Sequence, residues 1–274
     1  MTAQSIAQRF LEFSNCSPTA FHCVENVKRK LLAAGFEKVK LSGEKQISAN
    51  RFRRNGKYFF TRNESSIVAF AMGGEYQPGN GATVMVAHTD SPGLHLKPVS
   101  GTKSSGYNTL AVETYGGGVF SSWLDRDLSI AGRAFVKNGN AIESRLFKID
   151  RPILSIPRLA IHLWKSAERP NGVALNFENH LKPVISMIGQ NTKENNDENK
   201  AYGDKLFSLF SESLKIDKTD ILKIKAQLYG TEKGSIGGLN KEFVYAPRLD
   251  NQMMSFVVTT ALTNSVEGKI RIYE

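Results

Sequence analysis

The sequence predicts a mixed α/β fold in which helices are followed by buried strands. Three features indicate this class. Residues 3–14 place apolar side chains at helical spacing, residues 58–87 contain short apolar runs separated by turn residues, and the chain after Pro92 becomes rich in Gly, Thr and Val. Helices that precede buried strands are typical of layered α/β domains. A chain of 274 residues with 41% apolar composition can form one large domain or two moderate ones.

The N-terminal part of the chain is expected to form two helices and three strands. The first helix covers residues 3–14. Ser17 followed by Pro18 has the form of an N-cap with proline in the first turn of a second helix, and Gly35 stands where such a helix would end. The strands are expected at residues 58–60, 67–72 and 83–87.

The remainder of the chain is expected to be largely β-structure. Residues 94–150 read as antiparallel strands and turns, and the alternation of residues 221–229 is strand-like. Helices are expected over 156–167 and 206–214. We interpret 190–204 as a mobile surface loop, 234–238 as a turn, and the residues from Phe243 onward as helical.

Charge and composition exclude several classes without naming a function. The net charge is +10, but the Lys and Arg residues are dispersed and no nucleic-acid motif accompanies them, so we expect neither nucleic-acid binding nor membrane binding. No apolar run is long enough to cross a bilayer, and the N-terminus does not resemble a signal peptide, which predicts a cytoplasmic protein. Cys16 and Cys23 are too few for a disulfide framework or a cysteine zinc site.

The segment of residues 84–92 (VMVAHTDSP) carries the strongest chemical signal. An apolar strand runs directly into His88 and Asp90, which would project to the same side of extended backbone. A neutral imidazole can bind a divalent metal while a carboxylate orients it. The alternative is a structural histidine beside an aspartate that caps a turn, and the short pattern alone favours this alternative.

Three further segments carry weaker chemical signals. Asp250, in residues 246–251 (APRLDN), could cap the helix that begins near Gln252, or it could bridge two metal ions. The glycines of 116–118 lack a phosphate-loop pattern and are better interpreted as a turn. Residues 234–237 (GSIG) lack the spacing of a serine nucleophile elbow, which argues against a serine hydrolase.

Taken together, four motifs resemble the M18 family of aspartyl aminopeptidases, which are zinc metallopeptidases. They are residues 86–98 (VAHTDSPGLHLKP), 115–133 (YGGGVFSSWLDRDLSIAGR), 150–163 (DRPILSIPRLAIHL) and 242–251 (EFVYAPRLDN), in the order found in that family. The resemblance implies two zinc ions, with Mn²⁺ or Co²⁺ as possible substitutes, and release of Asp or Glu from peptide N-termini. It implies that His88 binds metal, that Asp90 orients this ligand, and that Asp250 bridges both metals. His162 would lie near the substrate, and His95 is given no role.

The resemblance also implies a domain layout and an oligomer. Residues 1–93 plus 244–274 would form an incomplete metallo-aminopeptidase-like catalytic domain, and 94–243 an inserted, largely β dimerisation domain. Assemblies in the family range from dimers to dodecamers. The family places its general base, a glutamate of a Glu-Glu motif, beyond the point matched by Glu274, so we expect a C-terminally truncated chain with 255–273 exposing Phe256, Val257 and Val258.

Two functions follow from these expectations. The first is an aminopeptidase for acidic N-termini, of which this chain is an N-terminal portion that is inactive alone because the general base is missing. The alternative is a non-catalytic binding or assembly subunit that pairs with full-length homologues.

Overall fold

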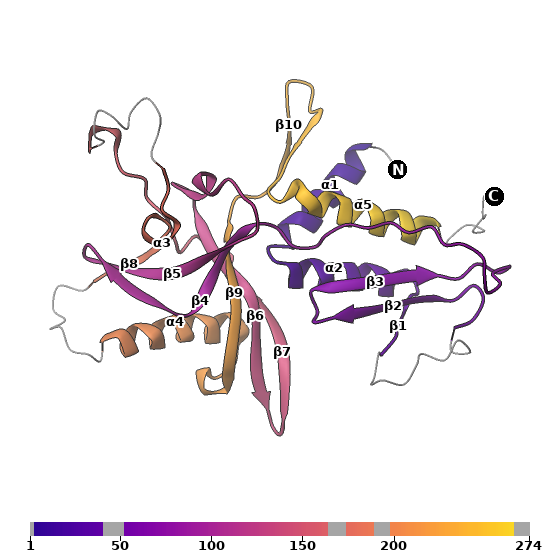
Figure 1. Ribbon diagram of the computed structural model, residues 1–274, viewed down its shortest axis with the longest axis horizontal. Coiled ribbons are helices and arrows are strands. Elements are labelled where there is room, and N and C mark those ends of the chain that lie inside the picture. Colours follow the sequence, from indigo (N-terminus) through magenta and orange to yellow (C-terminus); the bar gives the residue numbers. More distant parts are fainter. Residues whose placement is uncertain (1–2, 41–51, 164–173, 189–197, 266–274) are drawn as a thin grey trace. The chain divides into compact units, whose positions relative to one another are not determined.

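The computed structural model describes residues 3–40, 52–163, 174–188 and 198–265, and the chain forms two compact units (Figure 1). Unit 1 comprises Met1–Ser91 and Lys233–Glu274, and unit 2 comprises Pro92–Glu232. Unit 2 therefore interrupts unit 1 in the sequence. Among the described residues, no helix combines the length and apolar character that a membrane span requires.

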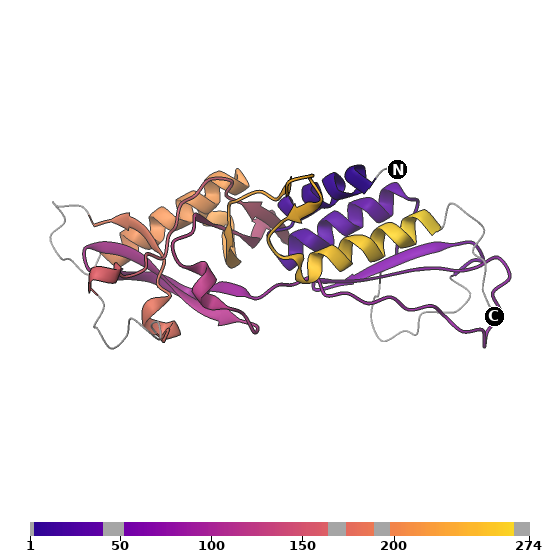
Figure 2. The ribbon, with the colours of Figure 1, turned by 90° about the horizontal axis from the view of Figure 1, so that it is seen from above.

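Unit 1 places helices over a small sheet. Three strands pair in the order β1-β2-β3, with β1 parallel to β2 and β2 antiparallel to β3, and a separate antiparallel ribbon joins β10 to β11. Figure 2 shows the helices α1, α2 and α5 stacked side by side on one side of β2 and β3. The elements are α1 (Ala3–Asn15), α2 (Ala20–Ala33), β1 (Glu37–Lys38), β2 (Lys57–Arg62), β3 (Ser66–Ala71), β10 (Ser235–Gly237), β11 (Phe243–Tyr245) and α5 (Leu249–Ser265).

The core of unit 1 forms where the three helices and β2 meet. Phe256 of α5 is 1% exposed, and its ring lies 5.7 Å from the rings of Phe10 and Phe13 on α1. Apolar burial of this kind is the main source of stability in a small unit. The buried cluster consists of Phe10, Leu11, Phe13, Cys23, Val27, Leu31, Phe36, Phe59 and Phe256.

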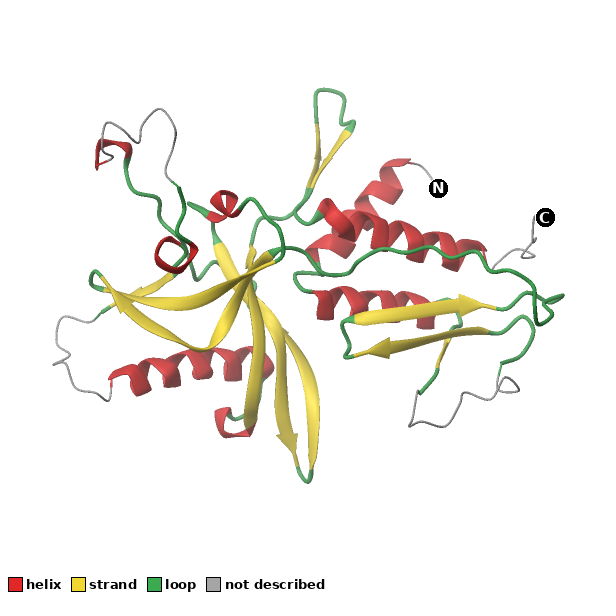
Figure 3. Cartoon of the chain, viewed as in Figure 1, coloured by secondary structure: helices red, strands yellow, loops and turns green. Residues whose placement is uncertain are grey.

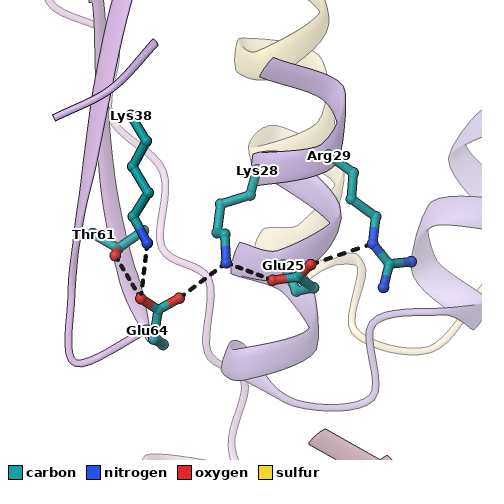
Figure 4. A network of polar contacts seen from close by, with 6 residues as sticks. All are labelled: Glu25, Lys28, Arg29, Lys38, Thr61 and Glu64. Carbon is teal, nitrogen blue, oxygen red and sulfur yellow. Dashed lines mark hydrogen bonds and ion pairs between the residues drawn. The ribbon is translucent and has the colours of Figure 1, made fainter. Parts of the chain in front are cut away.

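A network of charged side chains joins α2 to the β2–β3 turn on the surface of unit 1 (Figure 4). Lys28 donates to Glu25 at 2.7 Å and to Glu64 at 3.3 Å, and Thr61 donates to Glu64 at 2.8 Å. Burial raises the pKa of the Glu64 carboxyl, but the Thr61 hydroxyl and the lysine charges outweigh it, so this pKa lies below its usual value. Because the pairs are partly exposed, each contributes little to the stability of unit 1.

Most predictions for unit 1 are confirmed, with four corrections. One is that residues 243–245, expected to be helical, form the strand β11, and the helix begins only at Leu249. Helix α2 begins at Ala20, two residues later than predicted, because the N-cap is Thr19 rather than Ser17. The Thr19 side chain accepts a hydrogen bond from the backbone N–H of His22. The helix ends at Ala33, and Gly35, just beyond the C-cap Ala34, has the predicted left-handed conformation with a φ of 80°. Residues 83–87 form no strand, and residues 235–237 form a strand instead of a turn.

The expected exposure of α5 is also partly wrong. Phe256 is buried in the core, whereas Val257, the next residue, is exposed. Consecutive residues of a helix point about 100° apart, so a buried phenylalanine beside an exposed valine is what one-sided packing produces. Residues 266–274 lie outside the described part of the chain.

Unit 2 is built on a curled antiparallel sheet with the strand order β7-β6-β9-β4-β5-β8 (Figure 3). Helix α4 packs on it through Leu206 and Phe210, and Phe210 contacts Phe147 of β7 with ring centroids 5.1 Å apart. The elements are β4 (Gly93–Ser104), β5 (Tyr107–Tyr115), β6 (Leu128–Asn138), β7 (Ala141–Lys148), α3 (Phe177–His180), β8 (Val184–Met187), α4 (Glu198–Leu214) and β9 (Ile221–Gly230). Short 3-10 helices cover Phe120–Trp123, Ile161–Leu163 and Lys218–Asp220.

The strands of unit 2 confirm the prediction of a largely β region, but two helix predictions need correction. Residues 156–163 are irregular apart from the short turn at Ile161–Leu163, since only Ile156 of this range is buried and an apolar helix face is lacking. Residues 164–167 of the expected helix lie outside the described part. Helix α4 begins at Glu198, so the end of the expected loop 190–204 is helical. The start of that loop is not described.

Candidate metal site

His88 lies at the end of the irregular segment that follows β3, within unit 1. Its backbone carbonyl accepts a hydrogen bond from the hydroxyl of Ser255 on α5 at 2.8 Å. The next residue, Thr89, donates from its hydroxyl to the backbone carbonyl of Ser65 at 2.7 Å. These contacts tie the segment to both α5 and the beginning of β3, and so fix the position of the imidazole.

Asp250 lies at the N-terminal end of α5, where the helix is distorted. Asp250 and Asn251 have non-helical backbone angles, and the peptide bond between them is cis. The backbone carbonyl of Asp250 accepts from the hydroxyl of Ser91 at 3.3 Å. The side chain of Asp250 is 88% exposed, so at least one carboxylate oxygen is open to solvent.

The structure brings His88 and Asp250 together although they are 162 positions apart. His88 Nε2 and Asp250 Oδ1 are 2.8 Å apart, the distance of a charge-assisted hydrogen bond. The other ring nitrogen, Nδ1, is 2.9 Å from the backbone carbonyl oxygen of Asp90 and 3.5 Å from its carboxylate. The nearer partner of Nδ1 is therefore the main chain of Asp90 rather than the carboxylate that the sequence suggested.

The surroundings of His88 stabilise the protonated imidazole relative to that of a free histidine. Burial lowers the pKa of His88, but the Asp90 carbonyl and the Asp250 carboxylate outweigh this effect, and the pKa lies above its usual value. Two acceptors facing opposite sides of the ring fix its orientation. This is the arrangement in which one nitrogen is held by the main chain and the other is available to a ligand.

The donor types fit a zinc ion, but their number is small. An imidazole nitrogen and a carboxylate oxygen are preferred zinc ligands, and a catalytic zinc usually has three protein ligands. In the described ranges no group of three or more His, Cys, Asp or Glu residues is arranged to hold a metal. His88 and Asp250 can thus supply two of the ligands of such a site.

The other predicted site residue, His162, lies in unit 2. It belongs to the short turn Ile161–Leu163 and is exposed, with the exposed Ile161 and Leu163 on either side. Its role near a substrate stays a prediction. His95, which was given no role, stacks on Tyr115 with ring centroids 4.7 Å apart.

Sequence reasoning missed the residues that hold the pair in place. Ser255 and Ser91 each donate a side-chain hydroxyl to the backbone of the partner segment. Serine is common on helices and in loops, so neither residue carries a signal in the sequence. Ser91, inside the HTDSP motif, could have been noticed only because it follows the His-x-Asp pair.

Comparison with known proteins shows the family. Residues 13–273 match the family described as aminopeptidase I zinc metalloprotease (M18). The chain belongs to the M18 family. The aspartyl aminopeptidase of Aspergillus oryzae is 42% identical over 94% of this chain and 55% of its own length, and aspartyl aminopeptidase 1 of Schizosaccharomyces pombe is 42% identical over 97% and 57%.

Solved structures confirm the predicted α/β, metallo-aminopeptidase-like fold class. The chain matches a cryo-EM structure of an Ape4 and Nbr1 complex with a TM-score of 0.87 and 37% identity, covering 97% of this chain and 52% of that one. It matches the mApe1 dodecamer of Saccharomyces cerevisiae with a TM-score of 0.77 and 28% identity, covering 96% and 57%. The chain therefore spans little more than half the length of the M18 relatives it matches.

Proposed function

We propose that this chain contributes part of the binuclear zinc centre of an aminopeptidase that releases acidic residues from peptide N-termini. In this proposal His88 binds metal, Asp250 bridges the two ions, and Asp90 orients the imidazole. One observation supports it above the others: two zinc-type donors, 162 positions apart in the sequence, have side-chain atoms 2.8 Å apart. A purely structural histidine would not need an exposed carboxylate from a distant helix as its partner.

The two nitrogens of the His88 ring have different roles in this proposal. The Nδ1–H of His88 donates to the Asp90 carbonyl, which leaves Nε2 as the nitrogen that faces a ligand. The proton that Nε2 shares with Asp250 must leave when a metal binds, because metal ligands are deprotonated. A bound zinc pair would supply Lewis acidity and stabilise negative charge that develops on a peptide carbonyl oxygen.

The substrate class and the assembly rest on the relatives. Aspartyl aminopeptidases from a filamentous fungus and from fission yeast share 42% of their aligned residues with this chain. The net charge of +10 is compatible with acidic peptides. A dodecameric relative supports homo-oligomers, from dimers upward, for the protein of which this chain is part.

This proposal expects the chain to be inactive without further ligands. Two protein ligands are fewer than a catalytic zinc requires, and the described residues offer no third His, Cys, Asp or Glu beside them. The general base that the family resemblance implies has no counterpart among the residues assigned to the site. The alternative is an assembly subunit that pairs with full-length homologues without contributing to catalysis. The two proposals differ in whether His88 and Asp250 bind metal at all.

Zinc competition measures that difference directly. The purified chain, titrated with Zn²⁺ against a chromophoric chelator, should bind zinc weakly, and His88→Phe or Asp250→Asn should each weaken binding at least tenfold. His180→Phe, an exposed histidine of unit 2, is the matched control and should bind as the unchanged chain does. Zinc binding that neither substitution alters would leave the assembly subunit as the better proposal.

Activity provides the second measurement. The chain with added Zn²⁺, Mn²⁺ or Co²⁺ should release no aspartate from an N-terminal aspartyl amide. Turnover by the chain alone that His88→Phe abolishes would show that the site is already complete, contrary to the ligand count.

A further inference from the structure

The side-chain amide of Gln252, the second residue after Asp250, is buried in unit 1. Gln252 is 1% exposed, and its Nε2 donates to the backbone carbonyl of Ser17 at 2.6 Å. Ser17 is also buried and belongs to the connector between α1 and α2, residues 16–19. The amide therefore joins the start of α5 to this connector, although the two residues are 235 positions apart in the sequence.

The oxygen of the same amide has no such contact. Among the described residues, no donor hydrogen-bonds to Oε1 of Gln252, although this atom is shielded from solvent. A buried polar atom without a partner destabilises a fold, so stability alone would favour an apolar side chain of the same length at this position. The use of an amide at this position is explained by the bond that its Nε2 makes to Ser17.

The connector that accepts this bond is itself fixed to α2. Asn26 of α2 donates from Nδ2 to the backbone carbonyl of Cys16 at 3.0 Å and to the hydroxyl of Ser17 at 2.9 Å. The backbone N–H of Ser17 also donates to the carbonyl of Ser14 at 3.0 Å. The acceptor of the Gln252 amide thus has a defined position, which a contact must have if it is to constrain α5.

A second pair of contacts holds the chain on the other side of Asp250. Arg248 donates from Nη2 to the backbone carbonyl of Ser14, near the end of α1, at 2.9 Å. The buried hydroxyl of Ser14 donates to the backbone carbonyl of Pro247 at 3.2 Å. The chain that carries Asp250 is therefore fastened both two residues before it and two residues after it.

These contacts determine the direction of the Asp250 carboxylate. The side chain of Asp250 is 88% exposed, and its Oδ1 lies 2.8 Å from His88 Nε2. An exposed carboxylate is not held by packing, so its position follows the backbone from which it projects. Because hydrogen bonds weaken steeply with distance and angle, a small rotation at the start of α5 would separate Asp250 from His88.

We propose that Gln252 is a positioning residue for the metal site, because its bond to the Ser17 carbonyl fixes the start of α5 where the Asp250 carboxylate meets the His88 imidazole. The inference rests on the proposed function, in which these two side chains bind metal. Gln252 acts only through Asp250 and is not a metal ligand. Partners that orient metal ligands typically change metal affinity by about 10–100-fold.

A spectroscopic measurement without metal tests the positioning by itself. The ¹⁵N chemical shift of His88 Nε2 reports its hydrogen bond to Asp250, and it is recorded at one pH with a chelator present. The change of this shift in Asp250→Ala, which removes the carboxylate, defines the full effect. Gln252→Met, which keeps the length of the side chain and removes the donor, should produce at least half of that change.

The matched control is Thr259→Val, at another buried polar residue of α5. The Thr259 hydroxyl donates to the Ser255 carbonyl within the same helix, so its loss perturbs α5 without releasing the connector. This variant should leave the His88 shift unchanged. Hydrogen exchange of the α2 amides, measured on both variants, shows how far each one lowers the stability of unit 1.

Asn26→Ala keeps the test decisive if Gln252→Met does not fold. This substitution removes the donor that fixes the connector to α2 and leaves Gln252 in place. It should shift the His88 resonance in the same direction as Asp250→Ala, by a smaller fraction of the full effect.

Zinc competition separates this inference from the proposed function. Gln252→Met should weaken zinc binding about tenfold, and Thr259→Val should not weaken it. If Asp250→Ala leaves zinc binding unchanged, the proposed metal site is wrong, whereas the His88 shift still decides whether Gln252 positions the pair.

Three results would overturn the inference. The first is a His88 shift that neither Gln252→Met nor Asn26→Ala changes. The second is an equal change in Thr259→Val, because general loosening of α5 would then account for the effect. The third is a shift that Asp250→Ala leaves unchanged, since there would be no hydrogen-bonded pair to position.

Discussion

The packing of α5 predicts that Phe256→Ala will lower the free energy of unfolding of unit 1 far more than Val257→Ala, the substitution at the next residue. Phe256 is 1% exposed, and its ring lies edge-on to Phe10 and close to Phe13 on α1. The amine of Lys30 on α2 lies 4.0 Å from the centre of the same ring. One side chain thus joins all three helices of the unit.

The magnitude follows from these contacts. Truncating a buried phenylalanine to alanine costs about 3–5 kcal/mol through lost transfer energy and the cavity that remains. Each aromatic pair and the cation–π contact add roughly 0.5–1 kcal/mol, part of which the first figure already includes. We expect a loss of about 4 kcal/mol, a large share of the ~5–15 kcal/mol that stabilises a typical domain.

Because the chain has two units, the assay must report on unit 1 alone. Native-state hydrogen exchange of α2 amides gives the free energy of opening of that unit, and β6 amides give the value for unit 2. Phe256→Ala should lower the first and leave the second unchanged. Val257→Ala, at the exposed neighbouring position, should change neither by more than about 0.5 kcal/mol. A loss below about 1 kcal/mol at Phe256 would refute the assignment of this ring to the core.

Three further predictions follow from single contacts. Gly132→Ala should destabilise unit 2 by about 1–3 kcal/mol in urea unfolding, because the new methyl group would lie 2.2 Å from the backbone oxygen of Lys225. The control is Gly117→Ala, whose methyl group would contact no atom within 4 Å and should leave the stability unchanged. Burial, with a smaller effect of the charge of Arg9, lowers the pKa of Lys30 to about 8. Between about pH 8 and an ordinary lysine pKa of about 10.4, the unfolded chain binds more protons at this residue than the folded chain does. The free energy of unfolding should therefore rise with pH across that window, and the rise should be smaller in Lys30→Met. Ser255→Ala should cost about 1 kcal/mol in the α2 amide measurement, because the His88 carbonyl loses its hydroxyl donor, and an unchanged value would show that this bond contributes nothing.

Local patterns were enough to predict the elements that bury one face. The spacing of apolar residues in α1 and α2 and the alternation of β9 depend only on the chain itself, and the structure confirms them. The helix expected over 156–167 is absent from its described part, residues 156–163, where only Ile156 is buried and Leu159 and Ile161 are exposed. Residues 83–87 failed for a related reason, since a strand exists only where another strand is paired with it.

The candidate site was predictable in its residues but not in its contacts. The HTDSP and RLDN motifs indicated His88 and Asp250, yet no periodicity indicates that α5 returns to the end of the segment after β3. The preference of the His88 ring for the Asp90 carbonyl over its carboxylate was also inaccessible, because it depends on backbone direction at a single residue.

The contacts around the pair show how two distant motifs hold each other without a metal. Ser255, on the helix that carries Asp250, donates to the backbone of His88, and Ser91, on the segment that carries His88, donates to the backbone of Asp250. Each segment thus binds the main chain of the other, so the side chains of His88 and Asp250 are not needed to hold the two segments together. A site whose scaffold is fixed by backbone contacts keeps its geometry when the imidazole or the carboxylate is replaced. Loss of metal binding in His88→Phe or Asp250→Asn should accordingly occur without loss of the fold, which makes those substitutions a test of chemistry rather than of stability.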